Sequence, residues 1–147
     1  MGQYIRQRQH TLEEVLPIIL RCWKKGIEKS LVPSGFVVGV SSIRLKLFAQ
    51  QSTHKSGIHC VACGLKATHF AIERFRGSQL QSTHLNLYGW SGKTEVLFTK
   101  DHKVAKAKGG SNSLNNMQVM CQYCNSRKGT RNNREFLQQC NDRKQIA

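Results

Sequence analysis

Apolar residues recur at helical spacing between Thr11 and Ser30. Thr11 precedes this run and Glu14 stands three residues later, which is the sequence pattern of a capping box. The pattern predicts an amphipathic helix that begins after Thr11, with Pro17 delaying its start or bending it. Residues 1–10 are polar and basic and are expected to form a frayed arm. The apolar positions of the helix are Leu12, Val15, Leu16, Ile19, Trp23 and Ile27.

A short apolar strand at residues 36–40 and a second short helix are predicted next. Ser41 or Ser42 would cap this helix. A polar linker at residues 50–57 follows it. Residues 1–55 are therefore predicted to be a separate helical and strand segment of undetermined role, and residues 56–147 to be the main domain.

Alternation of apolar and polar residues marks the middle of the chain as β-rich. Strands are predicted at residues 68–75, 84–90 and 94–102, with a loop at 76–82 and a hairpin turn at 91–93. A loop containing lysines and glycines follows, and then a short strand at 117–120 and the start of a helix at Cys121. The tail is predicted to be a basic helix, because Phe136, Leu137 and Cys140 keep helical spacing.

Charge narrows the range of partners. The 147 residues contain 23 Lys and Arg against 8 Asp and Glu, a net charge of +15, which favours nucleic acid. A solvated basic surface or adhesion to anionic lipid is the alternative. The longest apolar run, residues 15–20, is too short to cross a bilayer, and the first residues have no secretory apolar core. The chain is expected to act in the cytoplasm, without a membrane.

Four of the six cysteines form two Cys-x-x-Cys pairs. Tetrahedral zinc takes four such sulfurs, and Gly64 follows the first pair where a positive φ is often needed. We predict one closed structural zinc site that joins two remote segments, with redox or unpaired thiols as the alternative. Cys22 and Cys140 are read as ordinary thiols. The predicted zinc ligands are Cys60, Cys63, Cys121 and Cys124.

The run from Val96 to Gly129 resembles the HNH endonuclease family, in the zinc-bearing form often found in bacteriophages. The resemblance rests on Asp101-His102, Gly109-Gly110, Asn116, Cys121-x-x-Cys124-Asn125 and Lys128-Gly129. It implies an α+β protein with a ββα-metal nuclease core, preceded by the N-terminal helical segment. It also implies a phage-encoded enzyme that acts in the bacterial host cell.

Roles follow from this resemblance residue by residue. His102 matches the general base that activates water, and Asn116 the residue that holds the loop so that the histidine stays aimed. Asp101 and Asn125 match the ligands of a catalytic divalent cation, Mg²⁺ or Mn²⁺. Because Asn125 stands where many members have a final histidine, the chain is an H-N-N variant. Many members continue Asp-His with Ile-x-Pro, whereas Lys103-Val104-Ala105 stands here.

Basic residues surround this motif and are expected to form a rim that binds the nucleic-acid backbone. The expected function is metal-dependent cleavage or nicking of DNA, with duplex DNA favoured. Two alternatives remain open: a zinc-containing module that binds DNA without cutting it, and an RNase of the same fold. The predicted rim consists of Lys103, Lys106, Lys108, Arg127, Lys128, Arg131 and Arg134.

Overall fold

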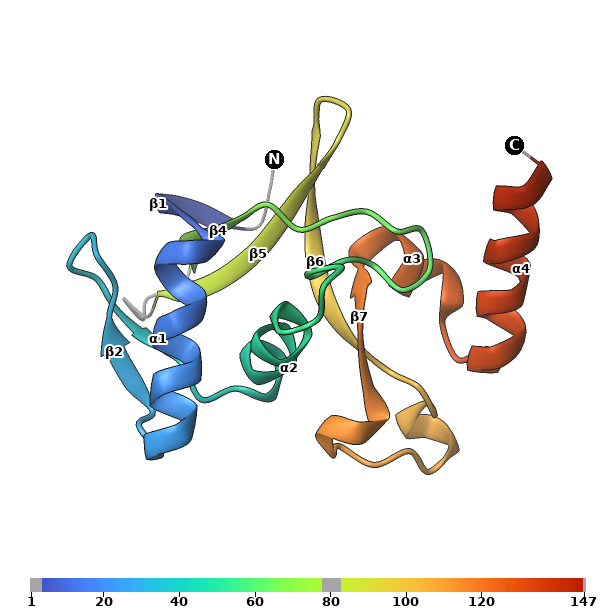
Figure 1. Cartoon of the computed structure of the whole chain (residues 1–147), viewed down its shortest axis with the longest axis horizontal. Helices are drawn as coiled ribbons and strands as arrows, with labels where there is room; N and C mark the ends of the chain where they lie inside the picture. The colour runs from blue at the N-terminus through green and yellow to red at the C-terminus, as the bar shows by residue number, and fades with distance from the viewer. Residues whose placement is uncertain (1–3, 78–82, 147) are drawn as a thin grey trace.

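The computed structural model describes residues 4–77 and 83–146. The predicted loop at 76–82 lies largely outside the described residues. In chain order the elements are β1 (Tyr4–Thr11), α1 (Leu12–Lys25), β2 (Lys29–Leu31), β3 (Val37–Gly39), α2 (Ile43–Ser52), β4 (His69–Phe75), β5 (His84–Ser91), β6 (Thr94–His102), β7 (Met117–Cys121), α3 (Gln122–Lys128) and α4 (Asn133–Ile146) (Figure 1). Short 3₁₀ turns at Lys106–Lys108 and Leu114–Asn116 lie in the loop between β6 and β7.

The main sheet has five strands in the order β1-β4-β5-β6-β7, and each neighbouring pair is antiparallel. The prediction of a frayed arm at residues 1–10 is wrong, because β1 pairs with β4 from Tyr4↔Phe75 to Thr11↔His69. An edge strand tolerates exposed charged residues, so the polar character of this segment did not exclude a strand. The sheet therefore crosses the boundary predicted at residue 55.

The predicted N-terminal helix is confirmed as α1. The Thr11 hydroxyl accepts a hydrogen bond from the Glu14 N–H at 3.1 Å, as a capping box requires. Pro17 does not delay the start of the helix, which begins at Leu12. The second predicted helix is confirmed as α2, with Ser42 as its N-cap, and the strand before it as β3. The partner of β3 in a two-stranded ribbon, β2, was not predicted.

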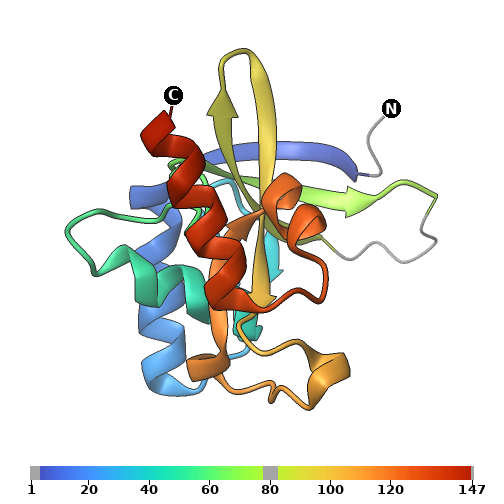
Figure 2. The same cartoon turned by 90° about the vertical axis from the view of Figure 1, so that its right-hand side faces the viewer.

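Helices α1 and α2 cover one face of the sheet (Figures 1 and 2). On that face Phe70 pairs with Leu87 and Ile72 with Leu85, and all four side chains are buried. Val15 and Ile19 of α1 and Leu45 and Phe48 of α2 belong to the same core. Burial of these side chains supplies the main stabilising free energy of the fold.

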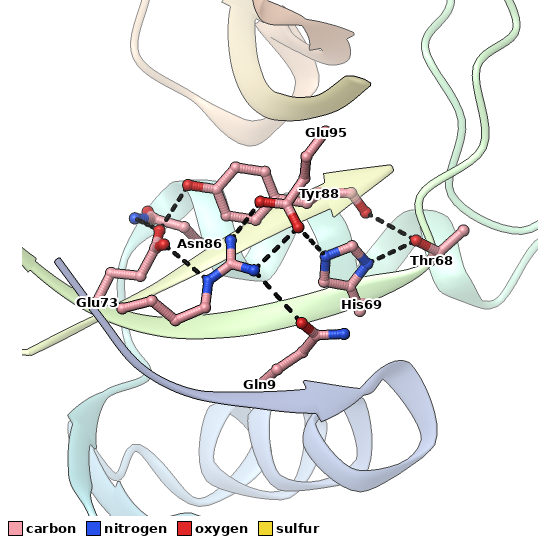
Figure 3. Close-up of polar contacts among 8 residues, drawn as sticks. Gln9, Thr68, His69, Glu73, Asn86, Tyr88 and Glu95 are labelled. Atoms are coloured by element: carbon pink, nitrogen blue, oxygen red, sulfur yellow. Dashed lines mark hydrogen bonds and ion pairs between the residues drawn. The ribbon is translucent and has the colours of Figure 1, made fainter. Parts of the chain in front are cut away.

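The other face of β4 and β5 carries a polar network (Figure 3). The buried Glu73 carboxylate accepts hydrogen bonds from Tyr88 Oη at 2.6 Å, Asn86 Nδ2 at 3.0 Å and Arg6 Nε at 3.1 Å. Arg6 also forms a salt bridge with Glu95, and His69 Nε2 lies 2.8 Å from the same carboxylate. The pKa of Arg6 is raised, because the hydrogen bond to Glu95 outweighs the effect of burial. This network attaches β1 to β4, β5 and β6.

In the C-terminal half, β6 and β7 form an antiparallel pair that leads into α3. The predicted hairpin at residues 91–93 joins β5 to β6, and β6 pairs with β7 from Phe98↔Cys121 to His102↔Met117. Helix α3 follows β7 directly and contacts both β6 and β7. The tail forms α4, with Phe136 and Cys140 buried, as the spacing predicted. Among the described residues no helix combines the length and apolar character needed to span a membrane.

Candidate functional site

Two cysteine pairs that are remote in sequence meet between β7 and the turn at residues 60–64. Cys121 ends β7 and Cys124 lies in the first turn of α3. The Sγ atoms of the four cysteines all lie within 4.8 Å of one another. Four sulfurs at this separation could hold a metal ion, and an all-sulfur set is the one that structural zinc prefers. The four residues are Cys60, Cys63, Cys121 and Cys124.

Backbone hydrogen bonds shape the first cysteine pair. Gly64 adopts a φ of +80° and its N–H donates to the Cys60 carbonyl at 2.9 Å. Val61 N–H donates to the Val119 carbonyl at 3.0 Å, which fastens the turn to β7. A side chain at residue 64 would strain this left-handed conformation, so the glycine is required by the turn.

The sulfurs are electrostatically coupled. The pKa of Cys60 is lowered to about 4, because the Cys121 thiol and backbone N–H groups donate hydrogen bonds to its sulfur. The pKa of Cys124 is raised to about 12 by burial and by the negative charge on Cys60. One thiolate thus discourages others nearby, and a cation among the sulfurs would remove that repulsion.

A second cluster lines an open hollow of about 290 Å³ beside the end of β6. Asp101 and His102 are the last two residues of β6, and Asn125 reaches the hollow from α3. Lys106 and Gly129 also line it. The pairing of β6 with β7 and the turn into α3 therefore bring three predicted site residues to one place.

The orientation of Asn125 is set by β6. Its Nδ2 donates to Thr99 Oγ1 at 2.8 Å and to the Lys100 carbonyl at 3.4 Å. Because the amide nitrogen is occupied by the strand, the amide oxygen is the end of the side chain that could bind a ligand.

Asp101 is buried and its carboxylate is held from two sides. Oδ2 accepts hydrogen bonds from Lys128 Nζ at 2.6 Å and from Gln118 Nε2 at 2.8 Å. Within the described residues both of these bonds end on Oδ2, so Oδ1 is the atom that could bind a cation.

Lys128 differs from the sequence prediction. It is 1% exposed, and its ammonium also donates to the His102 carbonyl at 2.7 Å, so it lies inside the protein and not on the rim. Lys128 follows Cys124 by four residues and Asn125 by three, which places it on the helix face that packs against β6.

His102 is half-buried and its Nε2 lies 2.9 Å from Asn112 Oδ1. Because an amide oxygen only accepts hydrogen bonds, a neutral His102 that donates to Asn112 carries its proton on Nε2, and its Nδ1 is unprotonated. Sequence reasoning missed Asn112. It is one of three asparagines between residues 112 and 116, and nothing in the sequence separates their roles.

Asn116 ties together the two ends of the loop that follows His102. Its Oδ1 accepts from Val104 N–H at 3.0 Å, while its Nδ2 donates to the carbonyls of Val104 and Ser111 at 3.1 and 2.8 Å. The Asn116 carbonyl also accepts from Lys103 N–H at 2.7 Å. These hydrogen bonds join residues 103–104 to residues 111–116 of the loop.

Residues 91–141 match the HNH endonuclease family. This segment belongs to that family. The matched HNH segment runs from the end of β5 into α4, and it contains Asp101, His102, Asn125 and the second cysteine pair but not the first. No curated protein and no solved structure matches the chain.

Six of the seven predicted rim residues are exposed in the HNH segment. Lys106 lines the hollow of Asp101 and His102. Four others line a neighbouring hollow of about 320 Å³, whereas Arg127 lies farther along, between α3 and α4. The four are Lys103, Lys108, Arg131 and Arg134.

Proposed function

We propose that the protein is a metal-dependent endonuclease that hydrolyses phosphodiester bonds of DNA. The observation that carries this proposal is the convergence of Asp101, His102 and Asn125 on one hollow within the HNH segment. Around that hollow the chain has lysines and arginines that suit a phosphate backbone.

His102 is proposed as the general base. Its Nδ1 takes a proton from the attacking water, while the hydrogen bond from Nε2 to Asn112 fixes the tautomer. Asn116 keeps the loop that carries Asn112 closed against the end of β6. Positioning of the base therefore depends on two asparagines.

Asp101 Oδ1 and Asn125 Oδ1 are proposed to hold Mg²⁺ or Mn²⁺. A hard cation prefers oxygen ligands, and one carboxylate with one amide leaves the rest of its coordination to water and phosphate. When bound, the ion would neutralise charge on the phosphate and stabilise the leaving oxygen. Lys128 already shares the Asp101 carboxylate, so we expect weak binding of the ion in the absence of DNA.

The four cysteines are proposed to hold Zn²⁺ in a structural role. With four protein ligands the ion has no open position for chemistry. The role of the zinc would be structural support, because it would join the turn at residues 60–64 to the end of β7 and to the start of α3. Helix α3 carries Asn125.

The test of this function is cleavage of supercoiled plasmid DNA with Mg²⁺, without added divalent ion and with EDTA, beside an RNA substrate. The proposal predicts nicked or linear DNA only where divalent ion is present. Absence of cleavage in Mg²⁺ and in Mn²⁺ would contradict it, and faster cleavage of the RNA would assign the substrate differently.

A further inference from the structure

A groove between α3 and α4 lies outside the candidate catalytic hollow. Its volume is about 170 Å³, which is room for several water-sized groups and so for a phosphate. Phe136 and Cys140 of α4 form its buried floor. Three arginines stand around it: Arg127, Arg131 and Arg143.

The arrangement follows from the sequence of α4. Gln139 and Cys140 each lie three or four residues from Phe136 and from Arg143, so the four residues share the face that lines the groove. The acidic residues of α4 do not line it, and one of them, Asp142, accepts a hydrogen bond from Gln138 on another face.

The charge in the groove is not neutralised by the protein. Among the side chains that the structure describes, none of its three arginines forms a salt bridge with a carboxylate. Arg127 lies against sulfur, with Nη2 at 4.0 Å from Cys124 Sγ and 3.9 Å from Cys140 Sγ. Arg131 and Arg143 are therefore the guanidinium groups available to an anion.

The groove is connected to the catalytic hollow through shared lining residues. Ala105 lines both the hollow of His102 and the neighbouring hollow of Lys103 and Lys108, and Arg131 lines both that hollow and the groove. In the described part of the chain, Asp101 is the single acidic residue that lines any of the three. The three hollows are thus neighbours, and basic residues line each of them.

We propose that the groove binds a backbone phosphate of duplex DNA, removed along the strand from the phosphate that is cleaved. Arg143 and Arg131 would bind it, since the guanidinium fork matches the geometry of phosphate oxygens. The inference rests on the proposed function insofar as DNA is the substrate. It adds α4 to the DNA-binding surface.

The test is the salt dependence of binding to a 20-base-pair duplex without added Mg²⁺, so that no cleavage occurs. Each phosphate contact contributes about 0.9 to the slope of log affinity against log salt concentration. Arg143→Gln should lower that slope by about 0.9, whereas Arg143→Lys, which keeps the charge, should retain most of it. Arg131→Gln is a second variant and should also lower the slope, although Arg131 lines the neighbouring hollow as well as the groove.

Arg21→Gln is the matched control, because Arg21 is exposed on α1, far from α4 along the molecule (Figure 1). It should leave the slope unchanged. If Arg143→Gln behaves like this control while the wild type binds DNA, the inference fails and the nuclease proposal is untouched. If Arg143→Gln lowers the slope but no plasmid is cut, the groove is supported and the nuclease proposal fails.

A wild type that does not bind the duplex would overturn the inference. An RNA duplex of the same length provides the remaining comparison. An effect of Arg143→Gln confined to that RNA would overturn the assignment to DNA.

Discussion

At the scale of single residues, the Lys128 ammonium donates hydrogen bonds to two oxygen atoms of β6. It lies 2.6 Å from the Asp101 carboxylate and 2.7 Å from the His102 carbonyl. One buried cation thereby fixes the backbone and side chain on which the proposed catalysis depends. Removing one partner of a buried ion pair leaves the other charge without compensation.

Lys128→Met should therefore lower the free energy of unfolding by about 3–5 kcal/mol, measured by urea denaturation. Lys103→Met, at an exposed position, should change it by less than about 0.5 kcal/mol. A stable Lys128→Met protein that has lost only DNA affinity would show that Lys128 contacts DNA and is not a structural residue.

Glu95 gives a pH-dependent contribution to stability. Burial raises the pKa of Glu95, but the hydrogen bonds from Arg6 and His69 together lower it by more, so its pKa is below the usual value. The stabilisation is complete above the unfolded-state pKa of about 4.3 and is lost as the pH falls through the lower folded-state pKa.

We expect the difference in unfolding free energy between wild type and Glu95→Gln to be largest above about pH 5 and to shrink below about pH 4. The measurement is urea denaturation of both proteins over a series of pH values from above pH 5 to below pH 4. Arg6→Gln should reduce the same pH dependence, because it removes a partner of Glu95. A difference that grows on acidification would show that this carboxylate destabilises the fold.

At the scale of elements, the cysteine cluster holds the turn at residues 60–64 against β7 and α3. Helix α3 has only seven residues, so its own backbone hydrogen bonds stabilise it weakly and its position depends on tertiary contacts. The proposed zinc therefore supports the orientation of Asn125.

Cys121→Ser should lose the metal and much of the fold, because closed zinc sites contribute on the order of 10 kcal/mol to folding in small domains. Cys22→Ala, at a buried position of α1, should keep the metal. Metal analysis and circular dichroism are the measurements. Purified wild type without bound metal under reducing conditions would contradict the zinc assignment.

Elements with strong local patterns could be predicted from the sequence, including α1 and its cap, β4 to β7 and the start of α3. The strand β1 could not, because its pairing with β4 depends on residues about 65 positions away, such as Glu73 for Arg6. Asp101 and His102 could be found because they are adjacent in a motif. The contacts of Asn112 and Lys128 depend on how a loop and a helix fold back, which a local pattern does not encode.

At the scale of the whole molecule, the basic residues behind the net charge of +15 have different surroundings. Arg6 and Lys128 form ion pairs with carboxylates of the sheet. Six exposed cations instead line the path of three neighbouring hollows from His102 to α4: Lys103, Lys106, Lys108, Arg127, Arg131 and Arg134. Binding of DNA along that path should release counterions and depend steeply on salt.

Lys106→Ala combined with Lys108→Ala should lower the slope of log affinity against log salt by up to about 2, without changing metal content. The paired substitution Lys24→Ala and Lys25→Ala, on α1, is the control and should leave the slope unchanged. Affinity that does not respond to salt would mean that the positive charge has another purpose.

The central claim is that His102 acts as a base at the end of β6. The most direct test is the initial rate of plasmid nicking in Mg²⁺ for wild type and His102→Ala, at matched protein, metal content and DNA occupancy. His102→Ala should keep its fold and metal, and its rate should fall by about 100-fold or more without rescue by added Mg²⁺ or Mn²⁺. Equal rates for the two proteins would contradict the assignment of His102 as the base.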